Sequence, residues 1–178
     1  MLDAVRIVAP HLPELHLWLC YAAAPLLDAV TSRIQNDATL RDRVHLLGRL
    51  SHATIETMMQ AADLFVLGSH REGSGYALIE ALACGLAPIV TDIPSFSALT
   101  AGGQVGRLWR CGDAQDLADA LVTLARDPQS RSEVRAHFDA EISFAALGRK
   151  LIAAYEDVRT HHATRLNAPA RSTSSAHG

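Results

Sequence analysis

The sequence predicts an α/β protein with a parallel sheet and helices on both faces. Short apolar runs that suit buried strands alternate along the chain with segments whose apolar residues recur at helical spacing. The intervals between them suit β–α–β units, in which a helix joins two parallel strands. With 178 residues, of which 49% are hydrophobic, the chain is long enough for one domain with a substantial core.

The predicted strands are nearly continuous apolar runs, as expected where helices cover both faces of a parallel sheet. They are 15–21, 44–47, 63–67, 87–91 and 104–110.

The predicted helices begin at residues that favour helix starts. Pro25 suits a first turn, and Ser51 and Asp113 suit N-caps. The predicted helical ranges are 1–9, 26–36, 51–62, 76–84, 95–100, 115–126, 128–138 and 144–160. We expect one domain over residues 1–160 and a disordered tail over residues 161–178, where apolar bulk is nearly absent.

The composition excludes several classes of protein. A net charge of −3 argues against a nucleic-acid partner. The widely spaced Cys20, Cys84 and Cys111 suggest free thiols in a reducing cytoplasm. Apolar runs stay below the ~18 residues that a membrane span needs, and no signal-peptide pattern is present.

The stretch Ser69–Gly85 organises the sequence, because it joins a strand to a helix through a polar, glycine-bearing loop. In open α/β sheets, ligands bind outside the carboxyl ends of the strands. Gly73, Ser74 and Gly75 allow a ligand to approach the backbone closely. The helix that opens near Tyr76 offers unpaired N–H groups and a partial positive charge, which suit a phosphate.

Two carboxylates, Glu72 and Glu80, stand on either side of this helix start. A phosphate repels carboxylates, but hydroxyl groups donate hydrogen bonds to them readily. Helical side chains lean toward the N-terminus, so Glu80 can reach back toward a group beside the anion. A nucleotide sugar, with hydroxylated rings on both sides of a diphosphate, fits this pattern. On spacing alone, an ordinary turn with two surface carboxylates explains it too.

The same stretch resembles the Glu-x7-Glu motif of retaining glycosyltransferases of the family 4 type, whose GT-B fold consists of two Rossmann-like domains. The matching residues include Glu72, Glu80, Gly85 and Pro88. The segments Val44–Gly48 and Ala61–Leu67 before the motif, and Gly106–Trp109 and Gly112–Ala118 after it, look similar as well. The resemblance covers about residues 1–126 and implies the C-terminal, donor-binding Rossmann-like half of such an enzyme.

The resemblance implies a role for each matching residue. Glu80 would bind the ribose hydroxyls, and Glu72 the donor-sugar hydroxyls as the catalytic-site carboxylate. The remaining predicted donor-binding residues are backbone contributors: Gly73, Ser74, Gly75, Tyr76 and Ala77 for sugar and diphosphate, and Gly48, Arg49 and Leu50 for the edge of the base. The expected reaction moves the sugar to an acceptor hydroxyl with retention of configuration, without a catalytic metal or other cofactor.

Two departures from the family lead us to expect an N-terminally truncated domain. The family's first strand, with its Gly-Arg-Leu and following Lys, has no counterpart before Leu15. That strand is central in the order 3-2-1-4-5-6, so its absence would leave a gap between 15–21 and 63–67. The acceptor-binding domain is also missing. A carbohydrate, lipid or other hydroxyl acceptor would bind through it, with possible peripheral contact at the inner membrane face.

Other functions compete with this interpretation. A non-catalytic remnant that binds nucleotide weakly, or acts only by association with another subunit, stays open. A dinucleotide enzyme is disfavoured because the G-x-G-x-x-G fingerprint is absent. His45, His52 and His70 lack the spacing of a metal site, and the glycines around Ser74 lack the full G-x-S-x-G pattern of a hydrolase nucleophile. His70 and Arg71 lie beside the motif and are candidates for a phosphate or sugar contact.

Overall fold

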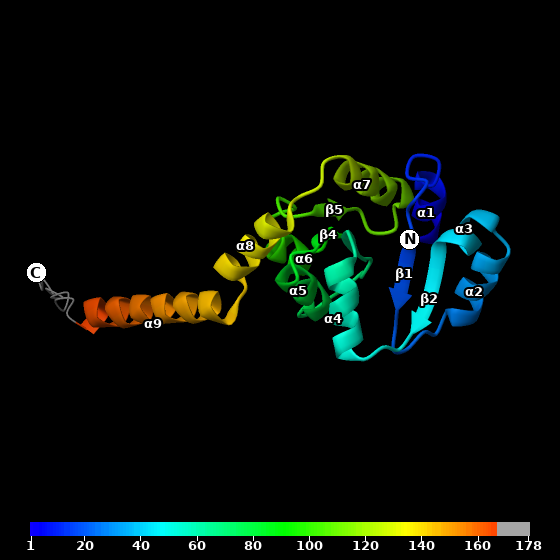
Figure 1. Cartoon of the computed structure of the whole chain (residues 1–178). Coiled ribbons are helices and arrows are strands. Elements are labelled where there is room, and N and C mark those ends of the chain that lie inside the picture. The colour runs from blue at the N-terminus through cyan, green and yellow to red at the C-terminus, as the bar shows by residue number, and fades with distance from the viewer. Residues whose placement is uncertain (167–178) are drawn as a thin grey trace, which may run out of the picture.

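A computed structural model describes residues 1–166 and has an α/β architecture in which helices flank parallel strands (Figure 1). Its helices and strands are, in chain order, α1 Leu2–Val8, β1 Leu17–Cys20, α2 Leu27–Gln35, α3 Ala38–Arg43, β2 Val44–Gly48, α4 His52–Ala61, β3 Leu64–Leu67, α5 Tyr76–Ala83, β4 Ala87–Thr91, α6 Pro94–Leu99, β5 Arg107–Trp109, α7 Ala114–Arg126, α8 Arg131–Glu141 and α9 Phe144–Leu166.

The strands form two sheets within the described residues. β1 pairs in parallel with β2, and Trp18 lies opposite His45 in their register. The second sheet has the order β3-β4-β5, again with parallel pairs. The central β4 is buried along its whole length, which is why Ala87–Thr91 is uninterrupted apolar sequence up to a buried threonine.

Each sheet has its own hydrophobic core, and α1 contributes to both. Val5 packs with Ile34, Leu40 and Val44 against the β1–β2 sheet. Ala4 and Val8, on the same helix, join the larger core around β3, β4 and β5. Leu15 also contacts both cores. The first helix therefore links the two parts of the fold.

The break between the sheets lies where the sequence predicts one. Within the described chain, β1 pairs only with β2 and β3 only with β4, so the predicted strands 15–21 and 63–67 are not hydrogen-bonded to each other. The elements match the predicted α/β fold class, and the parallel strands are divided into two sheets at the predicted gap.

Helix α8 anchors the helices on either side of β3. The guanidinium of Arg131 donates hydrogen bonds to the backbone carbonyls of Met59 and Ala62, at the end of α4, and of Cys84, which follows α5. Arg135 donates a 2.8 Å hydrogen bond to the carbonyl of Ala83. These cations satisfy carbonyls that have no partner within their own helix.

Several boundaries differ from the sequence prediction. Helix α3 was not predicted; it is short and begins where the Asp37 carboxylate accepts the N–H of Leu40 at 3.2 Å. Helix α8 begins after Ser130, which forms a capping box with Glu133, rather than at Pro128. Strand β5 covers only 107–109 of the predicted 104–110.

Helix α9 runs on to Leu166, past its predicted end at Thr160, and extends away from the domain (Figure 1). The rest of the predicted disordered tail, residues 167–178, lies outside the described residues.

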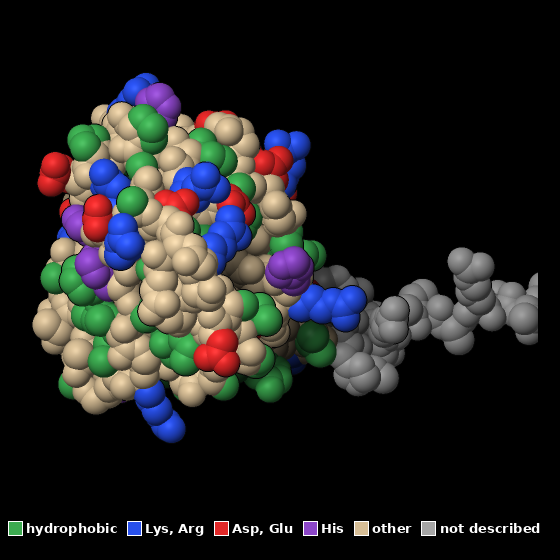
Figure 2. Space-filling model, turned by 90° about the vertical axis from the view of Figure 1, so that its right-hand side faces the viewer, with side chains coloured by type: hydrophobic (Ala, Val, Ile, Leu, Met, Phe, Trp, Pro, Cys, Tyr) green, Lys and Arg blue, Asp and Glu red, His purple; other side chains and the backbone are tan. Residues whose placement is uncertain are grey.

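Charges of both signs are mixed on the surface. On the face in Figure 2, Lys and Arg side chains lie among Asp and Glu side chains instead of forming one basic patch. This distribution agrees with the net charge of −3 and gives no support for a nucleic-acid interface on that face.

Candidate donor-binding site

The loop from β3 to α5 is held at its start by β4. The hydroxyl of the buried Thr91 donates a 2.6 Å hydrogen bond to the carbonyl of Ser69. Beyond this contact, residues 70–74 are exposed. The loop is thus fixed at the sheet and open to solvent where the sequence predicts ligand contacts.

Gly75 ends the loop and caps α5. Its φ of +64° is in the left-handed region, where glycine has no Cβ penalty. A Cβ at this position would lie 3.0 Å from Leu99 Cδ1 and 3.4 Å from Phe96 Cε1. Gly75 is buried, so conformation and packing together require glycine at the start of the motif helix.

The N-terminus of α5 faces solvent. Tyr76 and Ala77 are exposed, and the first intrahelical bond runs from the N–H of Ile79 to the carbonyl of Gly75. The N–H groups of the helical residues before Ile79 have no carbonyl partner within the helix. They are therefore available to an anion. Gly73 has open space where a Cβ would be, so a ligand can approach its backbone closely.

Glu80 connects this helix to the loop after β2. One carboxylate oxygen lies 3.9 Å from Nδ1 of His52, the first residue of α4. His52 follows the loop of Gly48, Arg49 and Leu50, in which Gly48 has a φ of +67° and open space around it. The fold therefore brings Glu80 and the predicted base-edge residues to neighbouring positions, although 30 residues separate Leu50 from Glu80.

Glu72 is placed differently from Glu80. Its carboxylate accepts the backbone N–H of Gly75 at 3.4 Å, within its own loop. This contact supports the left-handed turn before α5. The other side chains considered near the motif, His70 and Arg71, are exposed, as is Arg49.

The contact between His52 and Glu80 is not predicted from the sequence. The two residues stand 28 positions apart in the chain, and the sequence alone raises only the question of a metal-ligand role for His52. The available signal was Ser51, whose side chain caps α4 at the N–H of Thr54 and so places His52 in the first turn. Among the residues that the structure describes, no cluster of three or more His, Cys, Asp or Glu side chains is arranged to hold a metal.

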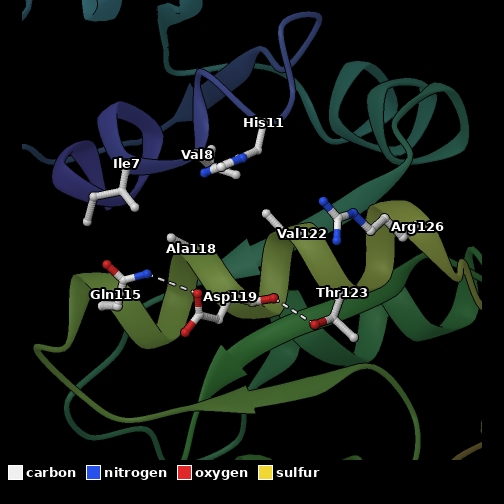
Figure 3. A pocket seen from close by; sticks show the side chains of 9 residues that line it. All are labelled: Ile7, Val8, His11, Gln115, Ala118, Asp119, Val122, Thr123 and Arg126. Atoms are coloured by element: carbon white, nitrogen blue, oxygen red, sulfur yellow. Dashed lines mark hydrogen bonds between the residues drawn. The ribbon is translucent and has the colours of Figure 1, made fainter.

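A separate hollow lies between α1 and α7 (Figure 3). It has a volume of about 320 Å³, and its lining includes the apolar side chains of Val8 and Ala118 and the polar side chains of His11, Asp119 and Arg126. None of its lining residues belongs to the Ser69–Gly85 stretch or to the loop after β2.

Over the described residues, no helix combines the length and the apolar content that a bilayer span requires.

Comparison with known proteins assigns the chain to a family. The family described as "Glycosyl transferases group 1" matches residues 28–140, which include the loop after β2 and the whole Glu72–Glu80 motif. The chain belongs to this family.

Curated relatives of the chain carry glycosyltransferase names. The phosphatidyl-myo-inositol mannosyltransferase of Mycolicibacterium smegmatis is 34% identical over 96 residues, which cover 52% of this chain and 24% of that protein. The D-inositol 3-phosphate glycosyltransferase of the same organism is 29% identical over 139 residues, which cover 78% of this chain and 32% of that protein. The chain thus spans about a quarter to a third of these relatives.

Solved structures confirm the GT-B type of fold. Sucrose-phosphate synthase from Thermosynechococcus elongatus superimposes with a TM-score of 0.70 at 22% identity, over 90% of this chain and 42% of that chain. Anabaena HepE in complex with UDP and glucose gives a TM-score of 0.69 at 23% identity, over 87% of this chain and 44% of that chain.

Proposed function

We propose that this chain binds the nucleotide-diphosphate sugar used by a retaining glycosyltransferase. The observation that carries the proposal is the meeting of two segments: Glu80 of α5 lies against His52, beside the loop after β2, while the open N-terminus of α5 starts one turn away. The loop proposed to border the base, the carboxylate proposed to bind the ribose and the helix N-terminus proposed to bind the diphosphate are therefore adjacent. A nucleotide sugar presents its base, ribose and diphosphate in the same order. The family and the names of the relatives support this assignment.

The proposed contacts assign to these residues the roles that the family resemblance implies. The Glu80 carboxylate accepts hydrogen bonds from the ribose hydroxyls, and the backbone of Gly48, Arg49 and Leu50 borders the base. N–H groups near Tyr76 and Ala77, together with the backbone of Gly73, Ser74 and Gly75, hold the diphosphate and the sugar. Glu72, whose carboxylate accepts the Gly75 N–H at 3.4 Å, accepts the sugar hydroxyls when the donor is bound.

The proposed reaction is transfer of the sugar to an acceptor hydroxyl with retained configuration and without a catalytic metal. The leaving diphosphate is then stabilised electrostatically, by the α5 N-terminus and by nearby cations. Arg49, His52, His70 and Arg71 are exposed basic side chains close in sequence to the motif and its partner loop. A further domain, in a longer polypeptide or in a partner protein, supplies the acceptor site for a carbohydrate, lipid or other hydroxyl compound. The enzyme works in the cytoplasm, either free or in peripheral contact with the inner face of the membrane.

Calorimetry with UDP, GDP and ADP tests donor binding by the chain as it stands. We expect one nucleotide to bind, and Glu80→Gln to weaken it about tenfold or more, because hydrogen bonds to a charged group contribute roughly 1.5–3 kcal/mol. The matched control is Glu156→Gln on α9, which removes a carboxylate far along the chain from the motif and should leave the affinity unchanged.

Two results would contradict the proposal. The first is a folded sample, judged by circular dichroism, that binds none of the nucleotides; this outcome favours the non-catalytic remnant. The second is a nucleotide affinity that Glu80→Gln leaves unaltered, since the ribose would then lie elsewhere.

A further inference from the structure

Helix α9 carries a row of large apolar side chains that faces solvent, on a helix that extends away from the domain (Figure 1). The members of this apolar stripe are between 51% and 96% exposed, and they are Phe144, Leu147, Leu151, Ile152, Tyr155 and Val158. Residues spaced by three or four positions lie on one side of a helix. At a rise of about 1.5 Å per residue, the stripe is therefore a continuous apolar strip about 21 Å long.

The domain holds α9 from its other side. Ala146 is only 1% exposed, and the helical turn of about 100° per residue places it away from the stripe. Lys150 then ties α9 back to the end of α8, because its ammonium donates a 2.9 Å hydrogen bond to the carbonyl of Glu141 and pairs with the carboxylate of that residue at 2.6 Å. These contacts orient the stripe outward.

A surface of this kind calls for a partner. Single exposed apolar residues are common on proteins, but a contiguous apolar patch marks an interaction surface. A helix in water also gains most of its stability by packing its apolar face. We therefore expect the stripe of α9 to be covered by another helix or by a surface of matching character.

The charges beside the stripe favour a second copy of the same helix. Lys150 and Asp157 are seven residues apart, so they stand two turns from each other on the same edge of the stripe. When two copies lie antiparallel, Lys150 of each copy comes to the level of Asp157 of the other. A parallel pair would bring each charge to the level of its own like charge. The charge pattern is thus complementary to itself in the antiparallel arrangement only.

The apolar side chains fit the same arrangement. A two-fold axis between positions 152 and 153 sets Leu147 opposite Val158 of the second copy. It also sets Leu151 opposite the small side chain of Ala154, so that large and small residues alternate across the contact.

We propose that two copies of this chain associate through the apolar stripes of α9 as an antiparallel helix pair. The leucines of each copy pack against the stripe of the other, and Lys150 of each copy faces Asp157 of the other. Six side chains from each copy form an interface at the small end of the specific range, so we expect a dimer with a Kd of about 1–100 µM. This inference does not depend on the donor proposal.

Sedimentation velocity of the full chain over a range of concentrations tests the association. We expect a monomer–dimer equilibrium that Leu151→Asp weakens at least about tenfold, because each dimer then loses two leucine contacts and must bury two charges. Ala153→Asp is the matched control. This residue is exposed on the same side of α9 as Ala146, away from the stripe, and its substitution should leave the equilibrium unchanged. Circular dichroism checks that both variants are folded.

A second pair of variants tests the antiparallel register. At low salt, Asp157→Lys should weaken the dimer about fivefold or more, since two attractive contacts with Lys150 become repulsive. Glu156→Lys makes the same change of charge on the side of the helix that faces away from the stripe, and it should have little effect.

The outcomes are distinct. A dimer that responds to Leu151→Asp and Asp157→Lys, but to neither control, supports the proposal. A chain that is monomeric at every concentration overturns it, and so do equal effects of a variant and its control. The chain is also pelleted with phosphatidylglycerol vesicles. If it is monomeric and binds them in a manner that Leu151→Asp abolishes, the stripe belongs to a lipid surface and the proposal is wrong.

Discussion

Gly75 shows how one residue can hold the candidate site together. Its left-handed φ of +64° turns the loop into α5, its N–H contacts Glu72, and its missing side chain leaves room for Leu99 and Phe96. The sequence indicates that a glycine is needed near the helix start, but the close contact with α6 is visible only in the structure.

Gly75→Ala should therefore destabilise the protein by about 1–3 kcal/mol, from the left-handed conformation of a residue with a Cβ and from the 3.0 Å contact with Leu99. Urea unfolding measures the change. Gly73→Ala is the matched control, because a Cβ there meets no atom within 4 Å. A Gly75→Ala protein as stable as Gly73→Ala would show that the turn before α5 is not constrained as described.

At the scale of elements, α5 owes its position to both of its ends. The N-terminus is shaped by the glycine turn, and the C-terminal carbonyls of Ala83 and Cys84 are capped by Arg135 and Arg131 of α8. Arg131 also holds the end of α4, the helix that carries His52. The two helices whose side chains meet at the candidate site are thus fixed by one cation.

Arg131→Ala should cost about 1–3 kcal/mol of unfolding free energy, because several helix-end carbonyls lose a charged donor together. It should also weaken nucleotide binding, since α4 and α5 lose their common anchor. Arg126→Ala on α7 is the control for the loss of one positive charge, because Arg126 is exposed and lines the hollow between α1 and α7. Equal effects of the two substitutions on stability would refute the anchoring role of Arg131.

At the scale of the whole molecule, the division into two sheets predicts two levels of stability. The β1–β2 pair is a two-stranded sheet with a small core around Leu40, and such a sheet is marginal without further support. The larger core around β4 includes many more fully buried side chains. We expect the smaller part to open locally while the larger part stays folded.

Leu40→Ala tests this division, because Leu40 is fully buried in the smaller core. Removing its side chain should cost about 2–5 kcal/mol and should accelerate hydrogen exchange in β1 and β2 while leaving β4 protected. Leu82→Ala, a similar truncation in the larger core, should accelerate exchange in β4 as well. If Leu40→Ala deprotects all strands equally, the domain unfolds as one cooperative unit.

Sequence reasoning reached the fold class, the order of the elements and the motif, because these depend on local patterns. Apolar runs gave the strands, and Ser51 and Asp113 were correctly placed as caps. The start of α5 at Tyr76 was also correct, since the preceding glycines limit where the helix can begin. The predicted start of α8 at Pro128 was wrong, because a second helix-start signal lies close to it in the sequence. Ser130 caps the helix instead, since its capping box with Glu133 satisfies more backbone donors.

The sequence by itself determined that this chain is an α/β domain with the Glu72–Glu80 motif at a helix start, since periodicity, caps and glycines act within a few residues. Only the tertiary structure decided that Glu80 meets His52 and that Arg131 ties α4 to α5. Those facts depend on contacts between residues far apart in the chain. Such contacts are set by how the helices and sheets pack together, which no local pattern specifies.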